Sequence, residues 1–283
     1  MEVKKPLVVG AGTMGAGVGQ LCAQCGYDVT VVDLSDELVD GARKKVEAGL
    51  AGRVEKGKID QAEMDSVLAR MSWSTDLETA RESDFVVEAV FEDMNIKQEL
   101  FGQLDSLCPA ETILASNTTA LSVSEIAGAT SRPDKVIGMH FFNPAVIMKL
   151  VEIIRGDNTS EETISATKKF AEDLGKTPIV TAKEAPAGIV SRVLAGLLNE
   201  AAAAYADGIA PATDIDEAMK LGAGLPMGPL ALLDMIGLDI HLAKMETLHA
   251  KLKDDRYRPP EIIRTMINEG RLGKKSGEGF HKY

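Results

Sequence analysis

Three glycines near the N-terminus form the pattern that most constrains the fold of this 283-residue chain. They directly follow an apolar run at residues 7–10 and open a helical pattern at about residues 13–25. In this context the first glycine permits a tight turn, the second lets the backbone approach a pyrophosphate, and the third lets helix and strand pack closely. The helix N-terminus then offers free N–H groups and a positive dipole to the phosphates. The pattern predicts a dinucleotide site with contacts from Gly10, Gly12, Thr13, Met14 and Gly15.

Asp33 ends the second apolar run, residues 29–33, and predicts which dinucleotide binds. A carboxylate at this point can accept hydrogen bonds from a ribose 2′-hydroxyl, whereas it repels a 2′-phosphate. No arginine follows it directly. The sequence therefore predicts NAD rather than NADP as the cofactor. The same glycine pattern also occurs in FAD sites and in turns that bind no ligand, and these are the alternatives.

Short apolar runs alternate with helical patterns through the first half of the chain, which is typical of βαβ units and a parallel sheet. Further strands are expected at residues 85–89, 113–116, 136–140, 150–154 and 178–181, with a helix at 94–108. Residues 36–71 have the pattern of two charged amphipathic helices, broken near Gly57, that project from the domain. We therefore expect an α/β fold in which a Rossmann-type domain, residues 1–185, carries a doubly wound parallel sheet. Residues 186–283 show only helical periodicity and predict an all-helical C-terminal domain.

Charge and composition limit the partners of the chain. The net charge of −12 repels polyanions, which argues against a nucleic acid or an anionic membrane as partner. No apolar run approaches the roughly 20 residues that span a bilayer, and no signal-peptide cleavage site is evident, so we expect a cytoplasmic protein. Three cysteines do not suggest a disulfide framework, and no metal is expected. Cys22 and Cys25 have a C-x-x-C spacing but lie inside a predicted helix, which favours helix packing over redox chemistry.

His140 is the residue best suited to proton transfer. Removing a hydride from a secondary alcohol requires a base that takes the hydroxyl proton, and imidazole does this near neutral pH. His140 ends a predicted strand, at the edge where open α/β sheets bind ligands. Glu152 closes the next apolar run and could hold the imidazole in one tautomer. The other histidines, His241, His249 and His281, lie in no such context.

Several motifs in a fixed order resemble those of one enzyme family. Beyond the glycine loop they are Glu88-Ala-Val-Phe-Glu92, Ala115-Ser-Asn117-Thr-Thr119, Gly138-Met-His140-Phe-Phe-Asn143-Pro, Lys149-Leu-Val-Glu152, Pro226-Met-Gly-Pro229 and Leu272-Gly-Lys-Lys-Ser-Gly-Glu-Gly-Phe280. The chain is similar, nearly end to end, to the short-form L-3-hydroxyacyl-CoA dehydrogenases, and among them to the bacterial 3-hydroxybutyryl-CoA enzymes. The resemblance implies an NAD-dependent oxidoreductase that acts on a short-chain 3-hydroxyacyl-CoA. It also implies a homodimer that is paired through the helical domain.

The resemblance further implies roles for individual residues. It pairs His140 with Glu152, whose carboxylate stabilises the imidazolium that forms. The positions near the nicotinamide half of the cofactor are Glu92, Lys97, Asn117 and Asn143. For Glu92 and Lys97 the alternative is an ordinary ion pair at a helix end.

Two catalytic positions depart from the pattern of the family, which places a serine hydroxyl and an asparagine amide against the reacting oxygen. Thr119 stands at the serine position, where it keeps the hydroxyl and adds a methyl group that stiffens χ1. Ser191 stands at the asparagine position, after a Pro186-Ala-Gly188 run where the family has Pro-Gly-Phe. A short hydroxyl replaces an amide that can donate two hydrogen bonds, and losing one such donor can cost about 3 kcal/mol of barrier. The two changes put full activity and the usual substrate in question.

Arg53, Lys56 and Lys58 form a small basic cluster in the expected helix pair. A solvated helix face would account for these charges, whereas the resemblance favours a clamp on the phosphates of CoA. Two other functions stay open. One is a dehydrogenase of a free hydroxy acid or sugar acid, similar to the L-gulonate and carnitine dehydrogenases. The other is a catalytically weak NAD-binding protein, which the departures at Thr119 and Ser191 keep in play.

Overall fold

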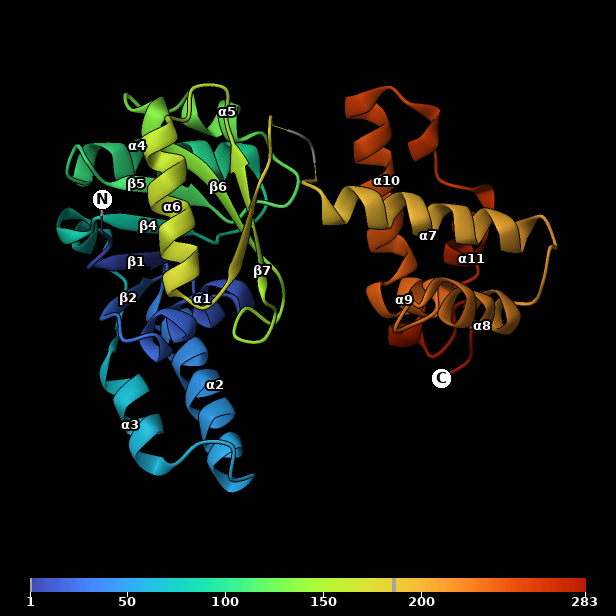
Figure 1. The fold of residues 1–283 in the computed structure, drawn as a ribbon, viewed down its shortest axis with the longest axis horizontal. Coiled ribbons are helices and arrows are strands. Elements are labelled where there is room, and N and C mark those ends of the chain that lie inside the picture. The colour runs from blue at the N-terminus through green and yellow to red at the C-terminus, as the bar shows by residue number, and fades with distance from the viewer. Residues whose placement is uncertain (1, 185–186) are drawn as a thin grey trace. The chain divides into compact units, whose positions relative to one another are not determined.

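The computed structural model describes residues 2–184 and 187–283 and divides into two compact units, residues 1–188 and 189–283. The first unit is an α/β domain and the second is all helical (Figure 1). The domain boundary expected between residues 185 and 186 falls on two residues outside the described ranges. Within those ranges, no helix has both the length and the apolarity that crossing a bilayer requires.

An eight-stranded sheet in the order β3-β2-β1-β4-β5-β6-β7-β8 forms the centre of the first unit. The strands are β1 (Pro6–Val9), β2 (Val29–Val32), β3 (Met71–Ser74), β4 (Phe85–Glu88), β5 (Ile113–Ser116), β6 (Val136–Phe141), β7 (Leu150–Arg155) and β8 (Thr177–Val180). Strands β1 to β6 are parallel, as expected. Strand β3 was not expected, because its sequence Met-Ser-Trp-Ser continues the helical pattern before it and has little apolar character.

The sheet is mostly parallel, as the expected doubly wound fold requires, and the exception is β7, which pairs antiparallel to β6. Only residues 142–149 connect these two strands, and a parallel connection requires a crossover of about a dozen residues or more. Strand β8 again runs parallel to β7, since a helix crosses over between them. The reversal sets β6 and β7 side by side in a hairpin arrangement, and the site depends on this pairing.

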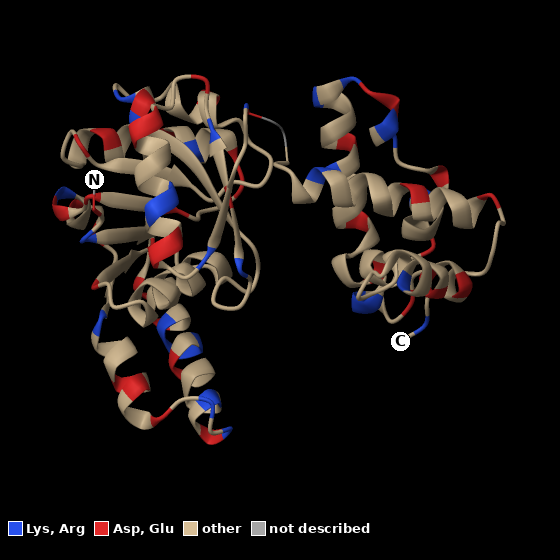
Figure 2. Cartoon of the chain, in the orientation of Figure 1, with Lys and Arg blue, Asp and Glu red and all other residues tan. Residues whose placement is uncertain are grey.

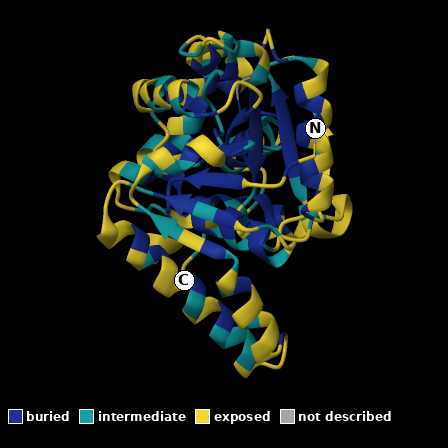
Figure 3. Cartoon of the chain, turned by 90° about the vertical axis from the view of Figure 1, so that its left-hand side faces the viewer, coloured by how far each residue is buried: buried dark blue, intermediate teal, exposed yellow. Residues whose placement is uncertain are grey.

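Helices cover both faces of the sheet, as a doubly wound fold requires. They are α1 (Thr13–Gln24), α2 (Asp36–Glu55), α3 (Gln61–Ala69), α4 (Met94–Leu107), α5 (Val123–Ala127) and α6 (Glu161–Asp173), with 3-10 turns η1 (Leu77–Glu82) and η2 (Pro133–Lys135). One core packs α1, α2 and α6 against the sheet, and a second packs α4, α5 and η1 against the other face. Because both faces are covered, the inner strands are almost wholly buried, whereas the edge strands β3 and β8 are partly exposed (Figure 3). Helices α2 and α3 extend beyond the sheet as the expected helix pair (Figure 1).

The second unit consists of helices with two short 3-10 turns. They are α7 (Val190–Ala206), α8 (Ala212–Ala223), α9 (Pro229–Ile236), α10 (Leu238–Leu252) and α11 (Glu261–Asn268), with η3 (Asp255–Tyr257) and η4 (Lys274–Ser276). Two buried carboxylates hold this unit together. Asp216 accepts hydrogen bonds from the backbone at the start of α9, and Asp234 accepts them from Phe280 and His281 in the C-terminal tail.

His241 is a buried imidazole on α10 that lies outside any expected site. Its side chain is 1% exposed, and its Nε2 atom has no hydrogen-bond partner within the described ranges. Burial, assisted by the charge of Lys244, lowers the pKa of His241 from 6.5 to about 4. The folded protein therefore keeps this imidazole neutral at a pH where the unfolded chain protonates it.

We predict that the protein loses stability as the pH falls from 6.5 towards 4, because the unfolded chain binds a proton at His241 and the folded chain does not. The loss attributable to this residue is on the order of 3 kcal/mol. His241→Leu should flatten this part of the dependence when thermal unfolding midpoints are measured across the range. His249→Leu, on the same helix but with a 36% exposed side chain, is the matched control. An unchanged slope in the His241 variant would contradict the assignment.

Candidate functional site

The glycine loop has the geometry that a dinucleotide requires. Gly10 has a φ of +104°, and a Cβ there would lie 2.6 Å from the carbonyl oxygen of Ala89. A Cβ on Gly15 would overlap the carbonyl oxygen of Gly10. The Cβ position of Gly12 has no atom within 4 Å, so the space beside this residue is open. Because Gly12 is also the N-cap of α1 and no side chain caps the helix, its first turn can receive a phosphate.

Asp33 joins this loop to the end of β2. Its Oδ2 atom accepts a hydrogen bond from the backbone N–H of Ala11 at 2.6 Å, and Oδ1 accepts one from Leu34 at 2.7 Å. The carboxylate is therefore fixed beside the glycine loop, where it can also accept a ribose hydroxyl. An open helix N-terminus without acidic residues in its first turn, next to this carboxylate, fits NAD.

His140 and Glu152 are directly opposite each other on the antiparallel strands β6 and β7. The His140 Nδ1 and Glu152 Oε2 atoms are 3.3 Å apart, and the two side chains are 8% and 1% exposed. The other ring nitrogen, Nε2, lies 3.5 Å from the hydroxyl oxygen of Thr119. The sequence analysis placed Glu152 at the end of an apolar run. In the structure it lies inside β7, which continues to Arg155. The imidazole is thus held by a carboxylate on one side and faces a hydroxyl on the other.

Glu88 is a site residue that the sequence analysis did not single out. It ends β4 at 0% exposure, and its carboxylate lies 2.5 Å from the Lys97 Nζ atom and 2.6 Å from the Ser116 hydroxyl. Lys97 is itself 1% exposed and also lies 3.4 Å from Glu92. A solvated ion pair at a helix end does not describe this buried arrangement. One feature of the sequence could have identified Glu88 as a site residue. It is a charged residue within the apolar run at 85–90, and a buried charge requires a partner.

Glu92 fixes the loop that follows β5. One carboxylate oxygen accepts hydrogen bonds from the Thr118 hydroxyl at 2.6 Å and from the backbone N–H groups of Thr119 and Ala120 at 2.8 and 3.0 Å. Burial alone would raise the pKa of Glu92, but these hydrogen bonds and the charge of Lys97 lower it below its usual value. The carboxylate therefore stays ionised, and its contacts place Thr119 beside His140.

The other residues expected near the nicotinamide lie on the adjoining loops. Asn117 follows β5, and its side-chain oxygen accepts a hydrogen bond from the backbone N–H of Phe141 at 2.8 Å. Asn143 follows β6 and is exposed. The structure thus places Glu92, Asn117, His140 and Asn143 at or just beyond the carboxyl ends of β4, β5 and β6, with Lys97 on α4 and Glu152 near the amino end of the antiparallel strand β7 beside them.

Ser191 and the basic cluster, which the sequence analysis also assigned to the site, lie on other elements than these loops. Ser191 is a buried residue on α7 of the second unit. Arg53 is in the last turn of α2, and Lys56 and Lys58 follow in the connection to α3, at the end of the helix pair away from the sheet (Figure 2).

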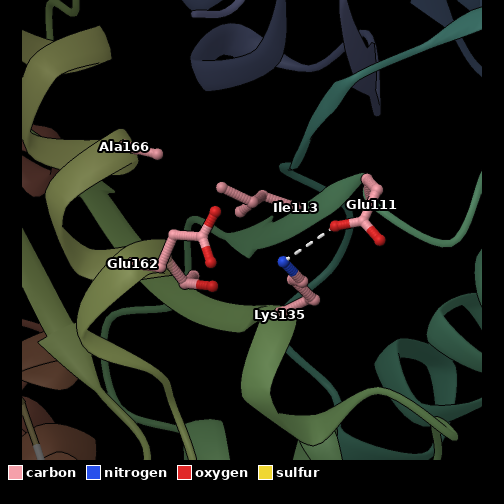
Figure 4. Close-up of a pocket in the computed structure, with 6 residues that line it drawn as sticks. Glu111, Ile113, Lys135, Glu162 and Ala166 are labelled. Atoms are coloured by element: carbon pink, nitrogen blue, oxygen red, sulfur yellow. Dashed lines mark ion pairs between the residues drawn. The ribbon is translucent and has the colours of Figure 1, made fainter. Parts of the chain in front are cut away.

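Neither the cysteines nor a surface cleft at the opposite edge of the sheet adds chemistry to this site. Burial raises the pKa of both Cys22 and Cys25, which opposes the thiolate that a redox pair requires. Within the described ranges, no three ligand-type side chains gather as they would around a metal ion. A cleft of about 230 Å³ lies at the amino end of β5, the edge opposite the glycine loop (Figure 4). Its lining residues are Glu111, Ile113, Lys135, Glu162, Thr163 and Ala166.

Known proteins resemble this chain over its whole length. The family profile described as "3-hydroxyacyl-CoA dehydrogenase, NAD binding domain" matches residues 6–185, and the C-terminal domain of the same family matches residues 189–283. A probable 3-hydroxybutyryl-CoA dehydrogenase of Bacillus subtilis (strain 168) is 48% identical over 283 residues, which cover 100% of this chain and 98% of the relative. A 3-hydroxybutyryl-CoA dehydrogenase of Clostridioides difficile is 44% identical and covers 99% of each chain.

A solved structure agrees with this assignment. The crystal structure of (S)-3-hydroxybutyryl-CoA dehydrogenase from Ralstonia eutropha superimposes with a TM-score of 0.96 at 42% identity and covers 100% of this chain and 99% of its own. The fold and the sequence relatives therefore agree in both domains, and the glycine loop supports the assignment of the first. The chain belongs to the 3-hydroxyacyl-CoA dehydrogenase family and carries that family's NAD-binding domain.

Proposed function

We propose that this enzyme interconverts a short-chain 3-hydroxyacyl-CoA and the corresponding 3-oxoacyl-CoA, with 3-hydroxybutyryl-CoA and acetoacetyl-CoA as the preferred pair. The observation that carries the proposal is the buried His140–Glu152 pair, which lies beside the Thr119 hydroxyl in a domain that binds NAD. The names of the relatives in Bacillus subtilis and Clostridioides difficile support the choice of acyl group.

In this proposal, His140 transfers the proton. During oxidation its Nε2 atom takes the proton of the substrate hydroxyl, and during reduction it returns that proton to the oxygen. For Nε2 to accept a proton, Nδ1 must carry one, and the Glu152 carboxylate at 3.3 Å favours this tautomer. The same carboxylate stabilises the imidazolium once the proton has moved. Bound NAD supplies the hydride acceptor.

The remaining site residues have distinct tasks. The glycine loop, Gly10 to Gly15, would hold the pyrophosphate, and Asp33 the ribose. Glu92, Lys97, Asn117 and Asn143 would surround the nicotinamide half of the cofactor.

Two hydroxyls would serve the reacting oxygen. The Thr119 hydroxyl, which lies 3.5 Å from Nε2, would donate a hydrogen bond to the oxygen on which charge develops. Ser191 would be the second donor, with a shorter reach than an asparagine amide has. The catalytically weak alternative is the case in which these two hydroxyls do not suffice.

The basic cluster of Arg53, Lys56 and Lys58 supports a CoA thioester over a free hydroxy acid. A CoA molecule carries phosphates that cations can hold, whereas a free hydroxy acid or sugar acid has none. Both lysines of the cluster are exposed at the end of the helix pair and are thus available to a ligand. We assign the cluster to the phosphates of CoA.

The enzyme works as a homodimer in the cytoplasm in this proposal. Large apolar side chains are exposed on the helical unit, where pairing with a second subunit would remove them from water. They include Val193, Ile209, Leu221, Met235 and Ile240, which are between 52% and 79% exposed.

We expect the purified enzyme to reduce acetoacetyl-CoA with NADH far faster than it reduces free acetoacetate or oxidises L-gulonate or carnitine. NADPH should be a poor substitute, because the Asp33 carboxylate repels a 2′-phosphate. Initial rates of NADH consumption measure the reductions, and initial rates of NADH formation from NAD measure the oxidations. A series of longer 3-oxoacyl-CoA thioesters measures the chain-length preference. Faster turnover of a free hydroxy acid would select the alternative substrate class, and no turnover of any of these substrates would select the weak NAD-binding protein.

His140→Ala should lower kcat by about 10² to 10⁴-fold, since general acid–base catalysis typically contributes this much. NADH should still bind, because His140 is not part of the glycine loop. Glu152→Gln should have a smaller effect, since the amide can still accept a hydrogen bond from Nδ1. Steady-state kinetics measure the loss of kcat, and fluorescence titration measures the binding of NADH. His249→Ala is the control for loss of an imidazole. An active His140→Ala variant would refute the mechanism.

Neutralising Arg53, Lys56 and Lys58 together should raise the KM for acetoacetyl-CoA and leave the KM for NADH unchanged. The KM for acetoacetyl-pantetheine should not change, because that thioester lacks the nucleotide phosphates. The matched control neutralises three exposed cations earlier on α2, which are Arg43, Lys44 and Lys45. If the two triple variants changed the KM for acetoacetyl-CoA equally, the cluster would be a solvated helix face and not a CoA site.

A further inference from the structure

Glu88, the last residue of β4, has a carboxylate that donors from three elements hold. Its Oε1 atom accepts hydrogen bonds from the Lys97 Nζ atom on α4 at 2.5 Å and from the backbone N–H of Val90 at 2.7 Å. Its Oε2 atom accepts one from the Ser116 hydroxyl at the end of β5 at 2.6 Å. The backbone oxygen of Glu88 also accepts one from the N–H of Asn117 at 2.8 Å. One buried residue thus joins the loop after β4, helix α4 and the loop after β5.

Lys97 connects this carboxylate to that of Glu92. The Lys97 side chain is 1% exposed, and its Nζ atom lies 2.5 Å from Oε1 of Glu88 and 3.4 Å from Oε2 of Glu92. A buried ammonium requires a partner that is itself held in place. Glu88 is wholly buried, whereas the Glu92 side chain is 39% exposed. Glu88 therefore fixes the ammonium, and the ammonium in turn attracts the Glu92 carboxylate.

Glu92 connects the ion pair to Thr119. Its Oε1 atom accepts hydrogen bonds from the backbone N–H groups of Thr119 and Ala120, while its Oε2 atom faces Lys97. The Thr119 hydroxyl lies 3.5 Å from Nε2 of His140. A shift of the Lys97 ammonium would therefore move the Glu92 carboxylate, and with it the hydroxyl that faces the imidazole.

We infer that Glu88 is a positioning residue of the reaction, which keeps the Thr119 hydroxyl in place beside His140. It acts through the two side chains between them, Lys97 and Glu92. The inference rests on the proposed function, because it gives Glu88 its effect through the hydroxyl that serves the reacting oxygen. Glu88 is 0% exposed, so it does not itself touch the substrate. A carboxylate that served stability alone would leave the rate of the chemical step unchanged.

The test compares Glu88→Gln with Asp105→Asn. Glutamine has nearly the size of glutamate, but its amide nitrogen is a donor, so one of the donors around position 88 loses its acceptor. Asp105 lies on the same helix as Lys97, near the opposite end, and accepts hydrogen bonds from Arg132 Nε at 2.6 Å and from the backbone N–H of Ser131 at 2.7 Å. Both variants neutralise a carboxylate that holds α4, but only the first does so at the site.

Glu88→Gln should lower the rate of acetoacetyl-CoA reduction in a single turnover roughly 10- to 100-fold, as expected when a group at the reaction centre is misplaced by about 1 Å. A single turnover, with the NADH-bound enzyme in excess over the thioester, reports the chemical step without product release. Asp105→Asn should leave this rate as it is in the unaltered enzyme. Thermal unfolding of each variant shows that folded proteins are compared.

A double-mutant cycle tests the route through Thr119. Thr119→Val replaces the hydroxyl with a methyl group of similar size and should itself slow the single turnover. Adding Glu88→Gln to Thr119→Val should then change the rate by less than about twofold, because the hydroxyl that Glu88 positions is gone. If Glu88→Gln slows the reaction by the same factor with and without this hydroxyl, the inference is wrong.

Ser116→Ala keeps the test decisive if Glu88→Gln folds poorly. It removes only the hydrogen bond to Oε2 of Glu88 and leaves the ion pair with Lys97 in place, so it should slow the single turnover at least about threefold. An unchanged rate would overturn the inference.

The outcomes separate the inference from the proposed function. If Glu88→Gln behaves as Asp105→Asn does while Thr119→Val is impaired, the inference is wrong and the proposed mechanism stands. If Thr119→Val is fully active, the role proposed for that hydroxyl fails, and the inference fails with it. If the unaltered enzyme does not reduce acetoacetyl-CoA, the proposed function itself fails.

Discussion

The burial of carboxylates at the sheet is the constraint on which the site depends. An ionised carboxylate loses much free energy on leaving water unless charges and hydrogen bonds replace its hydration. Glu88 meets this requirement with Lys97 and Ser116, and Glu152 with His140. Satisfying each carboxylate fixes the position of the groups around it, so the demands of folding also set the geometry of the chemistry.

The loops at the carboxyl ends of the strands are joined by the same kind of contact. Glu92 holds the loop after β5, and Asn117 joins that loop to the end of β6. Lys176, whose pKa burial lowers, donates hydrogen bonds to the carbonyl oxygens of Ala145 and Met148 and so holds the loop between β6 and β7. Loops that would be mobile by themselves thus present the nicotinamide and proton-transfer residues in a fixed arrangement.

The parts of the site that the sequence could predict have local signals. The glycine loop and Asp33 follow apolar runs at fixed spacing, and His140 ends a strand within a specific motif. The contact of Glu88 with Ser116 joins two neighbouring strands and has no local signal. The reversal of β7 does have one, because the connection of residues 142–149 is too short for a parallel crossover. Strand β3 has no local signal, because its pairing with β2 rather than its composition makes it a strand. The positive φ at Ala187, where glycine is the usual residue, likewise appears only in three dimensions.

The hairpin arrangement of β6 and β7 has a consequence for how the chain folds. His140 and Glu152 are 12 residues apart in the chain, whereas the Ala89 carbonyl that lies beside Gly10 comes from a strand much farther along. Closing a short loop costs less entropy than closing a long one, so the proton-transfer pair belongs to the contacts of lower sequence separation. Its geometry therefore depends on one local ladder, while the cofactor cradle depends on the ordering of the whole sheet.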